Sequence, residues 1–306
     1  MTYGKSKAAN EGGNAVLLAL GGLFLISILI IIGYSLASGP FEGCVGVVEI
    51  KGEIVSDDIP ATIFSDEVKG SETIANEIAS ADERQDVKSV LLLIDSPGGS
   101  VVASKQLYDA IRKLNKTSVT YINELAASGG YYVAAASDYI VANPDSITGS
   151  IGARATFTEM SGLFEKIGLN ETTIKTGKMK DIGSPSRPMT DEEQAIIQAI
   201  INESFQQFKS DVEAGRGSRL SPQLFATVLD ARILSGRQAK KIGLVDDLGN
   251  KESAVQKAGK LGGINNEPRL CELSSGKGKK GLFGSLSAEA IDFIAKSAGA
   301  PRLQYK

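Results

Sequence analysis

The stretch Glu124–Tyr131 (ELAASGGY) decides how this chain is expected to fold. It follows a short apolar run, Ser118–Ile122, and precedes a segment of small residues, Tyr131–Ser137. This order predicts a strand, a sharp turn and a helix, with Ser128 at the start of the helix and two glycines after it. Glycines let a substrate backbone approach closely, and the first N–H groups of a helix lack intrahelical partners and attract negative charge. The arrangement fits a nucleophilic serine with an oxyanion site, and it also fits a serine that only caps the helix.

The composition limits the chemistry available to such a serine. The 306 residues include no histidine, which excludes Ser-His-Asp and Cys-His catalysis. The two cysteines, Cys44 and Cys271, cannot complete the usual zinc ligand sets, so we expect no metal and no cofactor; they are compatible with a disulfide or with free thiols. The net charge of −3 gives no electrostatic footprint for nucleic acid.

A serine nucleophile in this chain needs a base other than histidine, and a desolvated lysine is the usual substitute. Such a lysine must be neutral at the working pH, so its pKa has to fall by about three units from about 10.4. Burial and loss of solvent can achieve that fall.

The N-terminal part predicts a membrane anchor. A polar segment, 1–14, precedes 23 residues without a charge, 15–37, which are enough to span a bilayer as a helix. Lys5 and Lys7 precede this run, so the positive-inside rule places the N-terminus in the cytoplasm and the bulk of the chain outside. We therefore expect a single-pass protein of the cell membrane with an extracytoplasmic domain. Ser35–Ala37 resembles a cleavage site, so a removed signal peptide is the alternative.

Strand and helix patterns alternate along residues 45–272. Val87–Ile94 is a continuous apolar run typical of a strand covered on both faces. The alternation predicts an α/β fold with a largely parallel, covered sheet. After this domain, residues 273–306 are expected to form a flexible basic linker and an amphipathic tail.

Three further elements are predicted between residues 157 and 212. We expect a helix over 157–167, a short strand over 171–175, and a long helix that begins at the capping box of Thr190 with Glu193 and runs to about Val212.

Two glycine-rich turns follow predicted strands. Asp95–Gly99 (DSPGG) ends the run at Ile94, and Ser128 with its two glycines ends the next strand. Because sites in open α/β sheets collect at the carboxyl ends of strands, we expect the two turns to lie close together, with backbone N–H groups facing an oxyanion. Each turn alone is equally compatible with a plain strand-to-helix connection.

The candidate bases lie in one irregular loop that holds Lys175, Lys178 and Lys180. A lysine cluster in a loop is often only solvated charge. A neutral amine would need a hydroxyl partner to hold it in place, and Ser150 in Gly149–Gly152 (GSIG) is the candidate, although a turn residue is the simpler interpretation of it.

At these residues the chain resembles the short, single-repeat form of the signal peptide peptidase A family, membrane-anchored Ser-Lys peptidases with a Clp-protease/crotonase-like fold. The matching stretches cover most of residues 45–250 in a specific order and spacing: Leu91–Gly99 (LLLIDSPGG), Ala126–Tyr132 (AASGGYY), Ala142–Gly152 (ANPDSITGSIG), Lys175–Arg187 (KTGKMKDIGSPSR), Met189–Glu193 (MTDEE) and Leu234–Gly249 (LSGRQAKKIGLVDDLG).

The resemblance assigns a role to five residues. It implies Ser128 as nucleophile and Lys180 as general base, with Ser150 positioning the lysine and the backbone N–H groups of Gly99 and Gly129 as oxyanion donors. In that assignment, Lys175 and Lys178 flank the base.

The resemblance also implies a ring-shaped homo-oligomer in which neighbouring protomers bring the serine and the lysine together. The expected substrates are short apolar peptides, such as signal peptide remnants. Three alternatives remain: a protease that clips a specific membrane-protein partner, a non-catalytic anchored ring that acts as a scaffold, and a crotonase-type acyl-CoA enzyme, against which the anchor and the Ser-Gly-Gly turn argue.

Overall fold

The computed structural model describes residues 20–30, 43–62 and 67–273. The chain separates into two units between residues 42 and 43. In the first unit residues 20–30 are helical, and no helix of the described chain has the length and apolar character that a membrane crossing requires. The rest of the anchor predicted over 15–37, the N-terminal segment 1–14 and nearly all of the tail lie outside the described residues.

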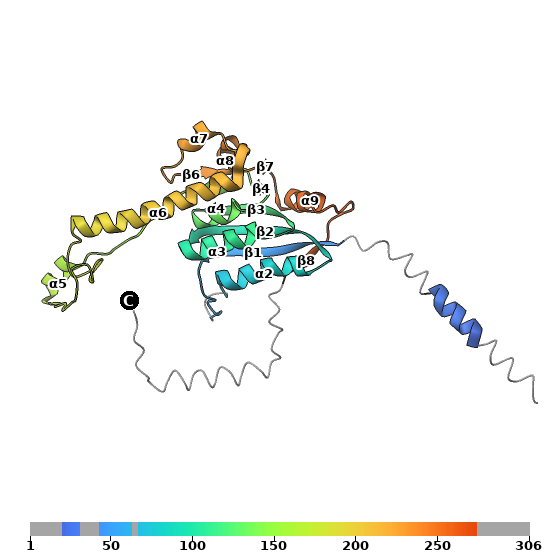
Figure 1. Ribbon diagram of the computed structural model, residues 1–306, viewed down its shortest axis with the longest axis horizontal. Coiled ribbons are helices and arrows are strands. Elements are labelled where there is room, and N and C mark those ends of the chain that lie inside the picture. The colour runs from blue at the N-terminus through green and yellow to red at the C-terminus, as the bar shows by residue number, and fades with distance from the viewer. Residues whose placement is uncertain (1–19, 31–42, 63–66, 274–306) are drawn as a thin grey trace, which may run out of the picture. The chain divides into compact units, whose positions relative to one another are not determined.

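The second unit is built on one sheet of eight strands in its described part, in the order β6-β5-β3-β2-β1-β8, with β4 beside β3 and β7 beside β4 (Figure 1). Every strand pair is parallel except β5 with β6, which confirms the predicted α/β class with a largely parallel sheet. The strands are β1 (Cys44–Ile54), β2 (Val87–Gly99), β3 (Thr117–Ala127), β4 (Tyr139–Ala142), β5 (Ile147–Gly149), β6 (Ile233–Ser235), β7 (Asp247–Leu248) and β8 (Leu270–Glu272).

Helices cover both faces of this sheet. Along β2 the side chains of Val90, Leu92 and Ile94 enter one buried cluster, whereas Leu91 and Leu93 enter another. The two-residue alternation of a strand therefore fills two cores, as the continuous apolar run predicted. The helices of the domain are α2 (Ser71–Glu83), α3 (Val101–Arg112), α4 (Gly129–Ala134), α5 (Ser161–Ile167), α6 (Asp191–Arg216), the 3₁₀ turn η1 (Gly217–Arg219), α7 (Pro222–Ala226), α8 (Gly236–Ile242) and α9 (Lys251–Leu261).

Strand β3 carries two neighbours in succession on the same side. Its residues Val119–Ile122 pair with β4, and Leu125–Ala127 pair with β5. The carboxyl end of β3 is thus fixed between β2 and β5, each of which ends in a glycine. Three strand ends meet where the sequence predicted the site.

Two of the predicted elements between residues 157 and 212 need correction. Residues 171–175 pair with no strand of the described chain, and the side chain of Ile174 is 96% exposed, so the predicted strand is wrong. A β-pattern without a neighbouring strand gains no ladder of hydrogen bonds. The helix predicted over 157–167 begins only at Ser161. The capping box of Thr190 with Glu193 is confirmed, and α6 continues past Val212.

Candidate active site

Ser128 occupies the junction of two elements, since β3 ends at Ala127 and α4 begins at Gly129. Its backbone has φ 52° and ψ −123°, a conformation that costs a residue with a side chain about 1–3 kcal/mol. Its hydroxyl makes no capping hydrogen bond to α4. Ser128 is therefore the N-cap residue of α4 by position, but its side chain does not cap the helix, and the hydroxyl remains available to a substrate.

Two glycine turns meet beside Ser128. A Cβ atom added at Gly98, whose φ is +99°, would lie 2.6 Å from the backbone nitrogen of Gly129. A Cβ added at Gly129 would lie 3.2 Å from the backbone nitrogen of Gly99. The β2 turn is held by Ser96, whose hydroxyl accepts a hydrogen bond from the N–H of Gly98 at 3.1 Å. The two N–H groups expected to form the oxyanion site thus lie in adjoining turns, and that of Gly129 has no acceptor within its helix.

Ser150 lies directly after β5 and lines a cavity together with Ser128. The N–H of Ser128 donates to the carbonyl of Gly149 at 2.9 Å, and the N–H of Ser150 donates to the carbonyl of Arg232 at 2.9 Å. Ser128, Ser150 and Ala231 all line a cavity of about 680 Å³. They are also the three non-glycine residues of the described chain with positive φ. Strained backbone concentrates at functional sites, which sets Ser150 apart from an ordinary turn residue.

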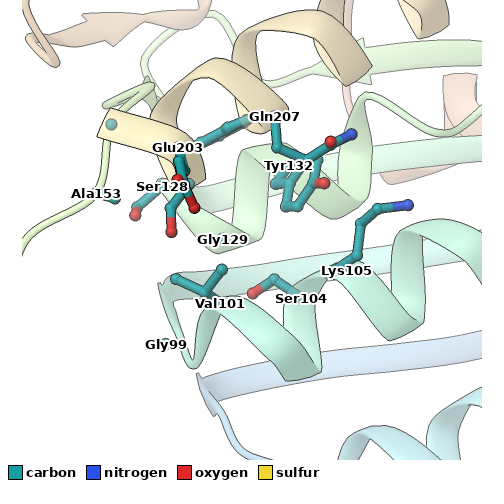
Figure 2. A pocket seen from close by; sticks show the side chains of 13 residues that line it. Gly99, Val101, Ser104, Lys105, Ser128, Gly129, Tyr132, Ala153, Glu203 and Gln207 are labelled. Atoms are coloured by element: carbon teal, nitrogen blue, oxygen red, sulfur yellow. The ribbon is translucent and has the colours of Figure 1, made fainter. Parts of the chain in front are cut away.

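A second pocket, of about 320 Å³, opens at Ser128 and runs between α3, α4 and α6 (Figure 2). Its side walls include the apolar parts of Val101, Tyr132 and Phe208. Burial raises the pKa of Tyr132, so its phenol stays protonated and donates a hydrogen bond to Asp211. The full lining is Gly99, Val101, Ser104, Lys105, Ser128, Gly129, Tyr132, Gly152, Ala153, Glu203, Ser204, Gln207 and Phe208.

The three candidate lysines differ in their partners. Lys175 forms an ion pair with Asp181, and Lys178 forms one with Glu192. Lys180 is exposed, and among the described residues its side chain makes no ion pair or hydrogen bond. Lys180 is also absent from the described linings of both Ser128 pockets.

Arg187 ties the lysine loop to the start of α6. Its guanidinium bonds Asp181 at 2.8 Å and Glu193 at 2.5 Å. Hydrogen bonds from Arg187 and from the N–H of Thr190 lower the pKa of Glu193 to about 2. Hydrogen bonds from Arg187 and then from Lys175 hold the pKa of Asp181 well below its usual range. Both carboxylates are therefore ionised at neutral pH.

One protomer thus holds most of the predicted site. Ser128, Ser150 and the two glycine N–H groups converge at the ends of β2, β3 and β5, while Lys180 lies elsewhere. Sequence reasoning missed Ala231 and the wall that α6 contributes to the second pocket, because neither a lone alanine nor a helical period indicates a site.

The chain is similar to known proteases in sequence. The family model of peptidase family S49 matches residues 110–265, and that of Clp protease matches residues 61–146. A putative protease of Methanocaldococcus jannaschii is 43% identical over 72% of this chain and 71% of its own length. A putative protease of Synechocystis is 39% identical over 67% of this chain and 73% of its own length. A putative signal peptide peptidase SppA of Enterococcus faecium is 32% identical over 80% and 70%.

Proposed function

Because the chain belongs to peptidase family S49, we propose that it is a serine endopeptidase in which Ser128 is the nucleophile and Lys180 the general base. The observation that carries the proposal is the turn at Ser128. A serine that adopts a strained backbone conformation and does not cap the helix behind it has no structural use for its hydroxyl.

The mechanism follows from the groups around the turn. The neutral amine of Lys180 takes the proton of the Ser128 hydroxyl as its oxygen attacks the peptide carbonyl. The N–H groups of Gly99 and Gly129 donate to the oxyanion, and the leaving amine takes the proton from the lysine. Water then releases the acyl group by the same steps. Ser150 holds the free amine in place.

The lysine that serves each serine comes, in this proposal, from a neighbouring protomer of a ring-shaped homo-oligomer. Two observations support it: Lys180 has no partner among the described residues, and the Ser128 pockets of its own chain do not include it. Lys175 and Lys178 are poorer candidates, since the amine of each is already engaged by a carboxylate, Asp181 and Glu192 respectively.

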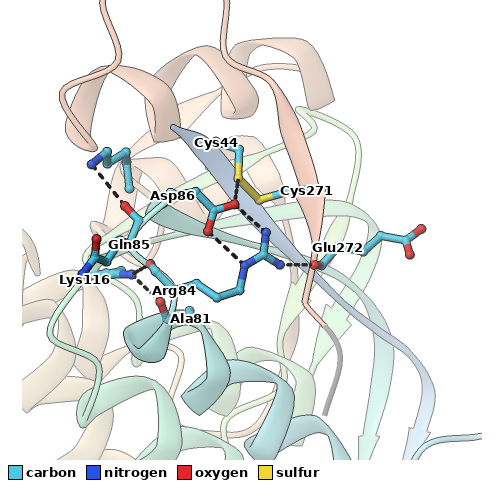
Figure 3. Close-up of a disulfide and its surroundings, with 9 residues drawn as sticks. Cys44, Ala81, Arg84, Gln85, Asp86, Lys116, Cys271 and Glu272 are labelled. Atoms are coloured by element: carbon cyan, nitrogen blue, oxygen red, sulfur yellow. Dashed lines mark hydrogen bonds and ion pairs between the residues drawn. A yellow bond between two sulfur atoms is a disulfide. The ribbon is translucent and has the colours of Figure 1, made fainter. Parts of the chain in front are cut away.

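A disulfide supports an extracytoplasmic site of action. Cys44, the first residue of β1, is joined to Cys271 in β8 across 227 residues of sequence (Figure 3). Beside it, Arg84 bonds Asp86 at 2.7 Å and the carbonyl of Glu272 at 2.7 Å. Disulfides persist in oxidising compartments and are rare in the cytosol. Together with the apolar run at 15–37, this favours a chain anchored by its N-terminus with the protease domain outside the cell membrane.

The proposed substrates are apolar peptides, such as remnants of signal peptides. The apolar walls of the smaller pocket, at Val101, Tyr132 and Phe208, suit an apolar side chain next to the cleaved bond. A protease that clips one membrane-protein partner would use the same groups, and a survey of cleavage sites in membrane proteins separates the two.

The test is cleavage of an apolar peptide by Ser128→Ala and Lys180→Ala variants. We expect each to lose activity by a factor on the order of 10³ or more, with unchanged circular dichroism, whereas Lys178→Ala retains most of it. A serine-reactive phosphonate should label Ser128 alone. Activity that survives in both variants would sink the proposal, and failure to label Ser128 would favour the scaffold alternative.

A further inference from the structure

The proposed base has an acidic neighbour in the chain. Asp181 follows Lys180 directly in the sequence, and a carboxylate with no other partner would be able to pair with the Lys180 amine, which would then not serve as a base. The Asp181 side chain is only 13% exposed, so solvent screens its charge weakly. A site that relies on Lys180 needs a device that keeps this carboxylate occupied.

Arg187 provides such a device, because its whole guanidinium is used in the loop. Nε and Nη2 donate to the two carboxylate oxygens of Asp181 at 3.2 and 2.8 Å. Nη1 and Nη2 donate to the two oxygens of Glu193 at 2.9 and 2.5 Å. Two more bonds run from Nη1 to the carbonyl of Pro188 at 3.1 Å and from Nη2 to the carbonyl of Asp181 at 3.4 Å. A planar fork that is bidentate on two carboxylates fixes both in direction as well as distance.

Glu193 connects this fork to the body of the domain. It is 2% exposed, lies in the first turn of α6, and accepts the N–H of Thr190 at 2.9 Å as part of the capping box. The helix α6 in turn lines the Ser128 pocket of its own chain through Glu203, Gln207 and Phe208. The lysine loop is therefore attached to a long helix, in addition to its hydrogen bond from the N–H of Met160 to the carbonyl of Pro185 at 2.7 Å.

We propose that Arg187 is a positioning residue for Lys180: it holds the carboxylate of Asp181 away from the amine and fixes the lysine loop on α6. This inference rests on the proposed function of Lys180. It adds a role for a residue that touches neither the nucleophile nor the base.

In the described chain, cationic side chains and an N–H group surround the two carboxylates that Arg187 binds, Asp181 and Glu193. Asp181 faces Arg187 and Lys175, while Glu193 faces Arg187 and the N–H of Thr190. Lys178 is bound to Glu192 on the first turn of α6. On the nucleophile side, the titratable or charged groups that line the cavities are Glu53, Lys105, Tyr132, Arg154 and Glu203. None of these is altered in the test that follows.

The test compares pH profiles of kcat in full-length Arg187→Gln, Asp181→Asn and the double variant. In Arg187→Gln the freed carboxylate of Asp181 should move the acidic limb of the kcat profile, where kcat rises with pH, to higher pH by on the order of one unit. Asp181→Asn should move it to lower pH, and the double variant should return it toward that of the unaltered protein. A merely structural role would lower kcat without moving the limb.

Two more variants separate charge from geometry. Arg187→Lys keeps the charge but loses the fork, so its limb should stay in place while kcat falls about tenfold and KM changes little. Arg84→Gln removes a comparable fork on Asp86 far along the chain and should change neither quantity.

The outcomes are distinguishable from failure of the proposed function. If Lys180→Ala stays active, the dyad itself is wrong. If Lys180 is essential and the acidic limb is unmoved in both Arg187→Gln and Asp181→Asn, the positioning role is wrong. Should Arg187→Gln fail to fold, the direction of the shift in Asp181→Asn decides alone.

Discussion

The two halves of the proposed site are built in opposite ways. The nucleophile half lies at three strand ends, where the half-buried Ser128 and Ser150 and two glycine turns are fixed by backbone hydrogen bonds and close contacts. The lysine half lies in an exposed loop before α6, held by ion pairs instead of a core (Figure 1). Packing thus fixes the two oxyanion N–H groups, whereas ion pairs fix the loop that carries the proposed base. In the proposed assembly, Lys180 would act on the serine of a neighbouring chain.

This difference has a consequence for when the enzyme is active. A protomer that carries the serine and the base on separate surfaces has no complete dyad of its own. In the proposed ring, a free protomer would be inactive, and activity would begin only when a second copy brings its lysine loop to the serine. The separation of the serine from the lysine thus leads to a hypothesis about assembly, which mixing of inactive variants can test directly.

The largest expected effect is complementation between two inactive variants. Ser128→Ala and Lys180→Ala proteins are each expected to be inactive alone. If each site takes its serine and its lysine from different chains, random co-assembly in equal amounts should restore activity at about a quarter of the sites. The measurement is peptide cleavage after the two proteins are unfolded, mixed and refolded together.

The control for this experiment is the double variant Ser128→Ala/Lys180→Ala co-assembled with unaltered protein. Such a mixture has the same average composition, and it also leaves about a quarter of the sites intact when the two residues come from different chains. If both residues came from one chain, it would leave about half of them intact, and the single variants would not complement at all.

The second prediction concerns the sheet on which the nucleophile half is built. The Cys44–Cys271 disulfide joins residues 227 positions apart in the sequence, so its removal should lower the free energy of unfolding by roughly 5 kcal/mol on the chain-entropy argument. Urea unfolding of oxidised protein and of a Cys44→Ser/Cys271→Ser variant measures the difference. A change below about 1 kcal/mol would contradict the entropy argument. The lysine loop, which has no bond to either cysteine, should keep its own protection from proteases.

The same contrast explains what the sequence could predict. Strand β2, the turn at Ser128 and the capping box of α6 follow from local rules, because apolar alternation, glycine and a Thr-x-x-Glu pattern act over a few residues. The strand expected over 171–175 failed because a strand needs a neighbour, which no local pattern supplies.

Other features of the site required the folded chain. The strain at Ser128, Ser150 and Ala231 is a tertiary property, and it distinguished a free hydroxyl from a helix cap. The preference for Lys180 over Lys175 and Lys178 came from the resemblance. The ion pairs of the other two give it a physical reason that spacing alone could not provide.

The third prediction tests how closely the nucleophile half is packed. A Cβ at Gly129 would lie 2.3 Å from the Ser104 hydroxyl oxygen and 3.2 Å from the Gly98 Cα and the Gly99 nitrogen, so Gly129→Ala should rotate Ser104 and push the start of α4 away from the β2 turn. We expect kcat/KM to fall by about 100-fold. In the lysine half, Gly162 in α5 has nothing within 4 Å of an added Cβ, so Gly162→Ala should raise stability by a few tenths to about 1 kcal/mol. A loss of kcat/KM in Gly162→Ala as large as that in Gly129→Ala would contradict the difference between the two halves.

The smallest expected effect is a pH dependence confined to the lysine half. The folded pKa of Glu193, about 2, lies below its ordinary value of 4.5. A lowered pKa stabilises the folded loop fully above pH 4.5, and this contribution is lost as the pH falls toward 2; Asp181 acts in the same direction. Brief digestion with an acid protease at pH 2 to 5 should therefore cut the loop between residues 175 and 190 before the sheet. Glu193→Gln should weaken that pH dependence and leave only the part due to Asp181, while Glu192→Gln, on the exposed side of the same turn, should not change it. Cutting that began in the sheet would show that the ion pairs are not what holds the lysine half in place.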